Sequence, residues 1–489
     1  MSFNSIEFFV FFALVVVGNY VLPQKYRWML LLSASYYFYM CWKAEYILLI
    51  VFSTLIDYFC GLRMANIKAK AKRKKYLILS LCVNLGVLFA FKYFNLFNDS
   101  LRSASNHFNI FYNVPSFNML LPVGISFYTF QTLSYSIEVY RGNQKAEKHL
   151  GIFALYVSFF PQLVAGPIER AGNLIKQFYR DNTFQYERVK SGILLMAWGI
   201  FKKIVIADRL AAFVNQVYNN PTDYVGVPLI VATYFFAFQI YCDFSGYSDI
   251  AIGTARILGI DLMRNFNQPY LSRSIPEFWK RWHISLSTWF RDYLYIPLGG
   301  NRVVFGRLLL NLILVFSISG LWHGANWTFV LWGLYHGALM VIAVLVKKGG
   351  IKVFSFLKNN RLMDLINMIL TFNLVCVGWV LFRANSISDA GYIYMHSLNF
   401  SGSKAFLSEL MLPGRCEILL GLTKIEIIVA VLVLFVLQAV EMMNKKYSLV
   451  KIYYRNPMVC RWLGYGVISL SILFLGYFSS NLDFIYFKF

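Results

Sequence analysis

The chain has 489 residues, of which 58% are hydrophobic and only 14% are charged. A soluble globular protein carries roughly 25% charged and about 45–50% apolar residues, so this composition excludes an ordinary cytosolic, secreted or disordered protein. The mean hydropathy of +0.55 points the same way, and the apolar residues recur along the whole chain. The sequence therefore predicts an all-α, polytopic membrane protein.

The net charge of +23 would suggest a nucleic-acid partner in a soluble chain. Here the basic residues lie in short loops between apolar runs, which is the bias that membrane insertion produces. We therefore expect contacts with membrane lipids and none with nucleic acid. The seven cysteines are scattered and form no CxxC pair, so they indicate neither a zinc site nor a disulfide framework.

The apolar stretches predict about twelve transmembrane helices, since a helix needs about 20 residues to cross a bilayer. The first stretch lacks a basic leader and a cleavage site, so it is expected to be a retained span. Two broken stretches, 151–166 and 275–299, predict re-entrant or interfacial helices, which need other protein to cover them. The predicted spans are 6–22, 28–42, 46–61, 76–97, 118–140, 191–213, 227–245, 306–321, 325–346, 362–384, 424–440 and 462–479.

The loop 62–76 is strongly basic, and this predicts that it lies in the cytoplasm. Counting spans from it places both termini and the loops 98–117 and 385–423 outside. We expect one domain with N-terminal spans (1–117), a catalytic core (118–384) and C-terminal spans with a tail (385–489). The other segments expected inside are also basic: 141–150, 167–190, 261–305, 347–361 and 441–461.

Two acids, Asp243 and Asp249, occur in an otherwise apolar stretch. Ionisable groups at membrane depth are costly and face a partner or a watery cavity. A structural pair with a buried arginine, a backbone cap and a functional role all stay open here. The nearby Gly246 and Gly253 suit close contact between helices.

The chain has six histidines. Three of them, His107, His149 and His396, lie in predicted aqueous loops and are expected to be solvated. The other three, His283, His323 and His336, fall in one region rich in tryptophan, arginine and glycine.

His323 follows an apolar run of about 14 residues, from Arg307 to Gly320, which as a helix spans roughly 20 Å. A hydrocarbon core is about 30 Å thick, so the run predicts a helix break inside the membrane. A neutral imidazole there can accept a proton from a hydroxyl, although a buried histidine can also be purely structural. The adjacent Trp322 and Asn326 and a second histidine nearby favour a functional role.

His283 lies between Arg281 and Arg291 in a segment dense with tryptophan. This pattern is typical of an interfacial helix with snorkelling side chains, and it also suits a pocket for a phosphate-bearing donor. His336 is expected to be a packed, hydrogen-bonded side chain. No metal site is predicted, because HExxH and histidines at i, i+4 are absent, and no GxSxG or Walker motif occurs.

Six ordered stretches resemble the membrane-bound O-acyltransferase family, most of all its bacterial polysaccharide O-acetylase branch, which acts on alginate or peptidoglycan. The resemblance runs from about residue 120 to the C-terminus. The stretches are LPVGISFYTFQTLSYSIEVYRG (121–142), FFPQLVAGPIERAGNLIKQF (159–178), YCDFSGYSDIAIGTARILGI (241–260), PEFWKRWHISLSTWFRDYLYIPLGGNR (276–302), GLWHGAN (320–326) and VGWVLFRA (377–384).

The resemblance implies a set of helices around a central funnel or tunnel with a thin waist. His323 matches the catalytic histidine of the family, and His283 matches its second polar position. With Arg281, His283 is expected to position a substrate or stabilise charge, and Trp322 and Asn326 are expected to contribute to the substrate site.

The resemblance also implies that an acyl group passes from a cytosolic thioester to a hydroxyl for a cell-surface polysaccharide, in a bacterial inner membrane. Acetyl-CoA is the expected donor, without a tightly bound cofactor, and an extracytoplasmic transferase is the expected partner. The D-alanine branch instead uses an acidic carrier protein, and the basic loop 264–302 suits either donor. A transporter or flippase of an acylated intermediate and a structural scaffold that recruits an extracellular transferase are the alternatives from other classes.

The chain ends NLDFIYFKF. Aromatic residues of this kind are favoured at membrane interfaces, which predicts an anchor. The ending also resembles a C-terminal aromatic motif of this acyl-transfer system, which implies that Tyr486 could enter the funnel as an acyl relay.

Overall fold

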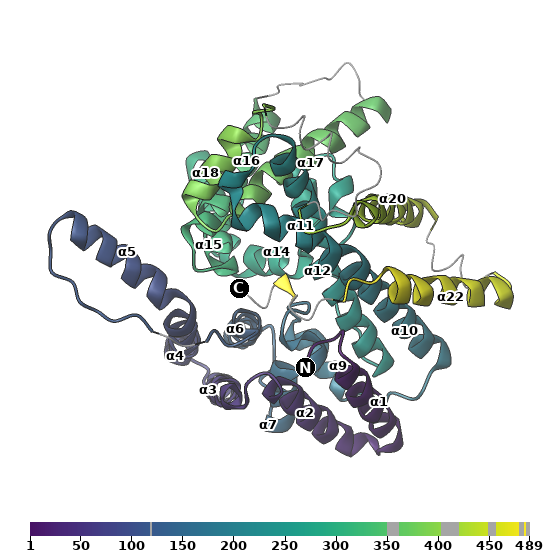
Figure 1. Cartoon of the computed structure of the whole chain (residues 1–489). Helices are drawn as coiled ribbons and strands as arrows, with labels where there is room; N and C mark the ends of the chain where they lie inside the picture. The colour runs from purple at the N-terminus through teal and green to yellow at the C-terminus, as the bar shows by residue number, and fades with distance from the viewer. Residues whose placement is uncertain (118–119, 350–360, 402–419, 448–455, 479–483, 486–489) are drawn as a thin grey trace.

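The computed structural model describes residues 1–117, 120–349, 361–401, 420–447, 456–478 and 484–485. It is built of helices, which confirms the all-α prediction (Figure 1). The N-terminal helices are α1 (Ile6–Val21), α2 (Gln24–Met40), α3 (Ile47–Ala65), α4 (Lys70–Leu88) and α5 (Phe94–His107). Those of the middle of the chain are α6 (Ile125–Arg141), α7 (Leu150–Ser158), α8 (Phe160–Leu163), α9 (Ala171–Phe178), α10 (Tyr186–Ile200), α11 (Asp208–Asn219) and α12 (Val227–Ile257). The remaining ones are α13 (Ile275–Arg281), α14 (Ile284–Phe290), α15 (Phe305–His323), α16 (Trp327–Lys348), α17 (Arg361–Arg383), α18 (Ile387–His396), α20 (Lys424–Tyr447) and α22 (Met458–Leu475).

Three of the shorter segments are π-helical turns inserted in or after α-helices: η2 (Phe89–Tyr93), η3 (Phe201–Ala207) and η6 (Arg291–Tyr295). Such turns occur often at functional sites. The short 3₁₀ segments are η1 (Ala44–Tyr46), η4 (Pro221–Asp223) and η5 (Pro269–Leu271).

Eight helical segments in the described part of the chain are long and apolar enough to cross a membrane. Each coincides with a predicted span, and the chain is a multi-pass membrane protein. The two broken stretches are broken in the structure as well. The first forms α7 and α8, and the second forms α13, α14 and η6. The helix expected from residue 118 begins at Ile125, because Gly124 takes a left-handed conformation (φ +77°).

The long helix α12 lies at the centre of the molecule and is buried on most of its surface. It continues to Ile257, twelve residues past the predicted end, because its acids are neutralised inside the protein. Asp243 lies 2.7 Å from Lys203 Nζ, and Asp249 lies 2.7 Å from Lys202 Nζ. The partners of these acids are therefore lysines of η3.

Glycines allow α10 and α12 to approach closely. A Cβ atom on Gly199 would lie 2.6 Å from the carbonyl oxygen of Gly246, and one on Gly246 would lie 2.8 Å from that of Gly199. Gly192 and Gly253 meet in the same way further along the helices. The predicted role of Gly246 and Gly253 in close helix contact is confirmed.

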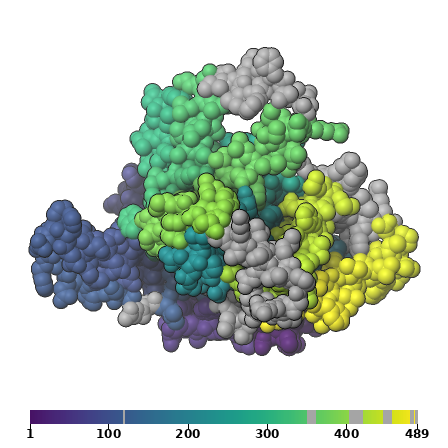
Figure 2. Space-filling view, turned by 45° about the horizontal axis from the view of Figure 1, so that its top comes forward, coloured from purple at the N-terminus to yellow at the C-terminus, as the bar shows by residue number. Residues whose placement is uncertain are grey.

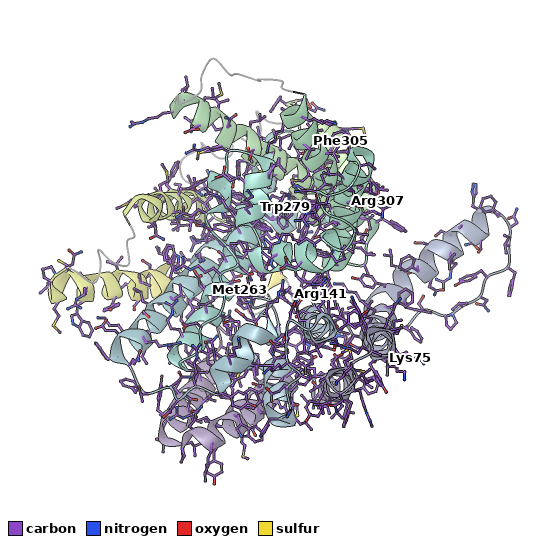
Figure 3. All side chains as sticks on the ribbon, turned by 180° about the vertical axis from the view of Figure 1, so that it is seen from behind. Lys75, Arg141, Met263, Trp279, Phe305 and Arg307 are labelled. Atoms are coloured by element: carbon purple, nitrogen blue, oxygen red, sulfur yellow. The ribbon has the colours of Figure 1, made fainter. Side chains whose placement is uncertain are left out.

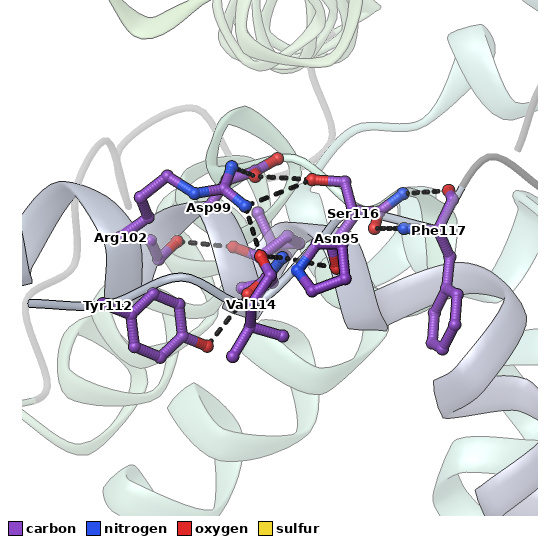
Figure 4. A network of polar contacts seen from close by, with 11 residues as sticks. Asn95, Asp99, Arg102, Tyr112, Val114, Ser116 and Phe117 are labelled. Atoms are coloured by element: carbon purple, nitrogen blue, oxygen red, sulfur yellow. Dashed lines mark hydrogen bonds and ion pairs between the residues drawn. The ribbon is translucent and has the colours of Figure 1, made fainter.

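Helix α5 and the loop after it form an arm that stands out from the helical body (Figures 1 and 2). Part of the loop predicted over 98–117 is thus helical, since α5 continues to His107. Polar contacts fasten the loop back onto the helix (Figure 4). Asn95 exchanges two hydrogen bonds with the Phe117 backbone (2.8 and 2.9 Å), and Arg102 binds both Asp99 (2.8 Å) and the carbonyl of Val114 (2.6 Å).

Candidate active site

His323 is the last residue of α15, and the chain leaves the helix in an extended conformation at Gly324. The predicted helix end at His323 is therefore confirmed. The helix α15 runs without interruption over 19 residues, past Gly320. That is about 28 Å at 1.5 Å per residue, close to a full hydrocarbon thickness. Helix length thus does not place His323 halfway through a bilayer, and its environment must be judged from its neighbours.

Gly320 has a packing role in this helix. A side chain on Gly320 would clash with the backbone of Phe329, and one on Gly333 would clash with the backbone of Phe316. Glycine at these two positions lets α15 and α16 touch through their backbones. The close contact sets the end of α15, and with it His323, against the first turns of α16.

Aromatic rings surround the His323 imidazole. Its ring centroid lies 5.0 Å from that of Trp322, 5.1 Å from that of Trp332 and 5.3 Å from that of Phe382. His323 is only 2% exposed. These rings keep bulk water away from the imidazole.

The second histidine, His283, lies beside His323. The two ring centroids are 6.4 Å apart, and His283 is also buried. Its ring contacts Phe244 of α12 edge-on at 4.6 Å. Residues 40 positions apart in the sequence thus converge in one buried site, and the prediction that both histidines act together gains a geometric basis.

The backbone of His283 has an unusual conformation. It precedes the first turn of α14 with φ +42° and ψ +57°, the left-handed region that non-glycine residues rarely enter. Such a conformation costs on the order of 1–3 kcal/mol and persists only when neighbouring groups hold it. Here Asn265 does so: its carbonyl accepts from Ile284 N–H at 2.9 Å, and its Oδ1 accepts from Ser285 Oγ at 2.6 Å.

The other predicted site residues fall into two groups. Trp322 contacts both histidines, with its ring 5.0 Å from His323 and 6.1 Å from His283. Arg281 instead forms an ion pair with Glu277 (2.6 Å) on α13. Asn326 caps α16, accepting from Thr328 N–H at 3.1 Å. The structure therefore brings Trp322 to the histidines and gives Arg281 and Asn326 contacts elsewhere.

His336 is fully buried against the rings of Trp279 and Trp332, each 5.0 Å from its own ring. Its predicted packing is confirmed. The predicted hydrogen bond is absent among the residues that the structure describes, where neither ring nitrogen has a partner.

Sequence patterns alone miss Lys92, a buried lysine of η2. Its Nζ donates to the carbonyl of Trp322, the residue before His323, at 2.6 Å. The signal that could have found it is a single lysine inside an apolar stretch, because cations at membrane depth are costly and commonly functional.

Three arginines gather around Tyr293 and Asp292 of η6, one from each of three segments predicted to be cytoplasmic. The guanidinium carbons of Arg141 and Arg170 lie 5.3 and 4.9 Å from the Tyr293 ring centroid. Arg291 pairs with Asp292 at 2.8 Å. In the view from behind, Arg141 lies near the middle of the helical body (Figure 3). Glu138 also lies 3.1 Å from Arg141, and Asp292 lies 3.7 Å from Arg170, so the three guanidinium groups share two carboxylates. The cluster keeps an excess of one positive charge, which suits a phosphate-bearing ligand.

A continuous series of rings connects this arginine cluster with His323. Tyr293 lies 5.1 Å from Trp289, which stacks on Phe130 at 3.8 Å. Phe130 lies 5.3 Å from Trp322, and Trp322 lies 5.0 Å from His323. The arginine cluster and the buried His323 imidazole are thus linked by directly packed side chains.

The last described residues, Phe484 and Ile485, lie among the helices next to α12 (Figure 1, yellow). Phe484 is 2% exposed, with Lys203 Nζ 4.3 Å from its ring centroid. The Ile485 N–H donates to Asp243 Oδ2 at 2.8 Å. For Phe484 the interpretation as a membrane-interface anchor is therefore wrong, since its ring packs inside the protein. Tyr486 lies outside the described residues.

In the ranges that the structure describes, no group of three or more His, Cys, Asp and Glu side chains comes together as a metal site.

Comparisons with known proteins show which family the chain resembles. Residues 149–387 match the model of the membrane-bound O-acyltransferase family, and this range contains both histidines. The chain is 42% identical over 405 residues to the "probable alginate O-acetylase AlgI" of Pseudomonas aeruginosa, covering 82% of this chain and 75% of that protein.

Two further relatives have other names. The peptidoglycan O-acetyltransferase of Helicobacter pylori is 35% identical over 428 residues, covering 80% of this chain and 78% of that protein. The teichoic acid D-alanyltransferase of Bacillus subtilis is 30% identical over 277 residues, covering 55% of this chain and 70% of that protein. With its helical fold, its buried histidine pair and these similarities, the chain belongs to the membrane-bound O-acyltransferase family and is an O-acyltransferase.

Proposed function

We propose that this enzyme transfers an acetyl group from acetyl-CoA in the cytosol to a hydroxyl acceptor on the other side of a bacterial inner membrane, for the modification of a cell-surface polysaccharide. The observation that carries the proposal is the convergence of His323 and His283 at the buried end of α15. The names of the relatives from Pseudomonas aeruginosa and Helicobacter pylori support an acetyl group and a polysaccharide acceptor.

In the proposed reaction, His323 takes the proton of the attacking hydroxyl. The hydroxyl oxygen forms a bond to the thioester carbonyl carbon, and a tetrahedral intermediate results. Its collapse breaks the C–S bond, and the thiolate receives the proton from the imidazolium. The products are an O-ester and a free thiol. His283 and Trp322 flank the imidazole and would orient the reacting groups.

The arginine cluster around Tyr293 supports a donor that carries phosphate. Acetyl-CoA and a phosphopantetheine group on a carrier protein share this chemistry, and the ring series from Tyr293 to Trp322 would guide the flexible arm that both contain. We favour acetyl-CoA because the relatives named O-acetylases match most of the chain, whereas the D-alanyltransferase of Bacillus subtilis matches 55% of it.

On the acceptor side, we propose that Tyr486 carries the acetyl group as an ester before an extracytoplasmic transferase takes it to the polysaccharide. The support is the position of the two residues before it. Ile485 binds Asp243 of α12, and the next residue of α12, Phe244, contacts the His283 ring. A tail held at this place has a short path to the histidines.

Replacing His323 with alanine tests the proposed base. Loss of a general base typically lowers a rate by about 10²–10⁴-fold. We expect His323→Ala to abolish thiol release from acetyl-CoA by the purified protein, and O-acetyl groups to disappear from the surface polysaccharide of cells that carry the variant. His107→Ala, at the exposed end of α5, is the matched control and should behave as the unchanged protein.

Near-normal thiol release by His323→Ala would reject the base. Transfer from a D-alanyl carrier protein but not from acetyl-CoA would reject the donor. Transport of an acylated intermediate without thioester consumption would reject the enzyme mechanism proposed here.

Tyr486→Phe tests the relay, because phenylalanine keeps the ring and lacks only the attacking hydroxyl. We expect polysaccharide acetylation to stop and an acetylated peptide containing residue 486, detectable by mass spectrometry in the unchanged protein, to disappear. Acetyl transfer at the normal rate would remove the relay and leave the base at His323 standing.

A further inference from the structure

Lys92 occupies a buried position for which the proposed reaction has no role so far. It is 7% exposed and lies on the π-helical turn η2, which joins α4 to α5. Its Nζ donates to Ser126 Oγ at 2.9 Å and to the carbonyl oxygen of Trp322 at 2.6 Å. No carboxylate forms an ion pair with it among the residues that the structure describes. A buried ammonium group without an anion is costly, so its retention calls for a specific reason.

The bond to Trp322 explains what the ammonium group does for α15. Because α15 ends at His323, the carbonyls of its last turn have no amide partner within the helix. Lys92 Nζ donates a hydrogen bond to the carbonyl of Trp322, and the neighbouring Tyr93 hydroxyl donates one to the carbonyl of Leu321 at 3.1 Å. A cation at this position also complements the negative end of the helix dipole. The turn η2 is thus a cap, built from a distant segment, for the helix that carries His323.

The same group connects α15 with α6. Ser126 lies in the first turn of α6 and accepts from Lys92, and its own carbonyl accepts from the Trp322 indole N–H at 3.4 Å. The ammonium group also lies 5.7 Å from the Trp322 ring centroid. Lys92 therefore holds both the backbone and the ring of the residue that directly precedes His323.

The charge of Lys92 also matters for the reaction. Attack on the thioester places negative charge on its carbonyl oxygen, and fixed positive charge in a water-poor site stabilises such a state more than it stabilises the neutral substrate. An anion already paired with Lys92 would cancel this effect, which gives a reason for the missing carboxylate.

We propose that Lys92 is a positioning residue of the transfer site, which fixes the orientation of His323 through the Trp322 carbonyl and supplies the only positive charge that the described residues hold against this end of α15. The inference rests on the proposed role of His323 as the base. It assigns a function to a segment outside the part of the chain that matches the family model, residues 149–387.

Graded substitutions at Lys92 test the proposal. Lys92→Met removes the donors and the charge, and Lys92→Gln keeps a donor for a carbonyl without the charge. Because misplacing a reacting group by about 1 Å can cost about 10²-fold, we expect kcat for thiol release to fall on the order of 10²-fold in Lys92→Met and less in Lys92→Gln. KM for acetyl-CoA should stay within about twofold, because the arginine cluster is unchanged.

Tyr93→Phe is the matched control. It removes the adjacent carbonyl bond, one residue further from His323, and changes no charge, so its loss of kcat should be smaller than that of Lys92→Met. If Lys92→Met does not yield folded protein, the kcat of Lys92→Gln relative to Tyr93→Phe decides the question.

Unchanged kcat in Lys92→Met or in Lys92→Gln, or an equal loss in Tyr93→Phe, would overturn the proposal. His323→Ala is measured in parallel. An active His323→Ala protein overturns the proposed base itself, whereas an inactive one beside a fully active Lys92→Met protein overturns only the inference about Lys92.

Discussion

Lys203 and Lys92 are both buried ammonium groups on π-helical turns, and they are balanced in different ways. Lys203 lies between two carboxylates, with Asp208 at 2.8 Å and Asp243 at 2.7 Å. Lys92 has a backbone carbonyl and a serine hydroxyl instead. The first cation therefore belongs to a group with an excess of negative charge, whereas the second has no carboxylate against it among the described residues.

The difference separates a structural role from a functional one. In a paired cluster the charges satisfy each other, and the arrangement holds α12, η3 and the Ile485 backbone together. When only dipoles hold a cation, most of its electric field still acts on a charged group that comes close to it. We infer that the charged group around Lys203 supports the fold and the tail, whereas the site around Lys92 is prepared for a negative charge that forms during the reaction.

The largest effect on stability is expected from breaking the paired cluster. Asp243→Ala removes one partner of Lys203 and the acceptor of the Ile485 N–H. Lys203 keeps Asp208 as a partner, so the loss comes from two hydrogen bonds to a charged acceptor, at about 1.5–3 kcal/mol each, and from the cavity that alanine leaves. We expect a clear drop in the thermal unfolding midpoint in detergent. Asp249→Ala, which breaks the more exposed pair with Lys202 on the same helix, is the matched control and should lose less. Equal losses would show that burial does not distinguish the two pairs.

A smaller effect on stability is expected at the unpaired cation. Lys92→Met loses two hydrogen bonds from a charged donor, for which about 1.5–3 kcal/mol each is typical, but methionine fills the site and leaves no partner charge buried. The unfolding midpoint should therefore fall less than in Asp243→Ala, although kcat falls strongly. A midpoint lower than that of Asp243→Ala would mean that Lys92 acts mainly on the fold.

The smallest effect is expected in the arm formed by α5 and its loop. Arg102 and Asp99 form an ion pair with side chains that are 36% and 58% exposed, and exposed pairs contribute about 0.2–1 kcal/mol. Arg102→Ala should leave the unfolding midpoint within a few degrees of the original and should speed proteolysis of the loop 108–117 only. A large drop in the unfolding midpoint would contradict the expectation that exposed ion pairs stabilise the fold less than buried ones.

Much of the fold follows from the sequence, because long apolar runs form helices wherever lipid or protein surrounds them. The predicted helix ends are wrong where charged residues lie within a helix. The span predicted to end at residue 245 continues to Ile257, since Lys202 and Lys203 neutralise its acids from another helix. The helix expected to end at residue 97 continues through η2 to His107. Contacts between distant segments decide where such helices end, and the local composition of the sequence carries no information about these contacts.

The site could be predicted in part. Motif resemblance identifies His323 and His283, and the structure brings their rings together. Arg281 and Asn326 are close to these residues in sequence, but the direction of a side chain from its helix gives them other contacts. Lys92 lies more than 200 residues from Trp322, so no local pattern connects them.

The π-helical turn η2 has a consequence for how this chain can vary. It holds an extra residue relative to a regular helix, and deleting one residue there would rotate everything after it by about 100° around the axis of α4. The ammonium group would then point away from Trp322, and the arm would project in another direction. Natural variants should therefore tolerate exchanges at the exposed Phe89 and Ala90 but very few deletions within the turn, because the length of the turn sets the direction of both the Lys92 side chain and the arm.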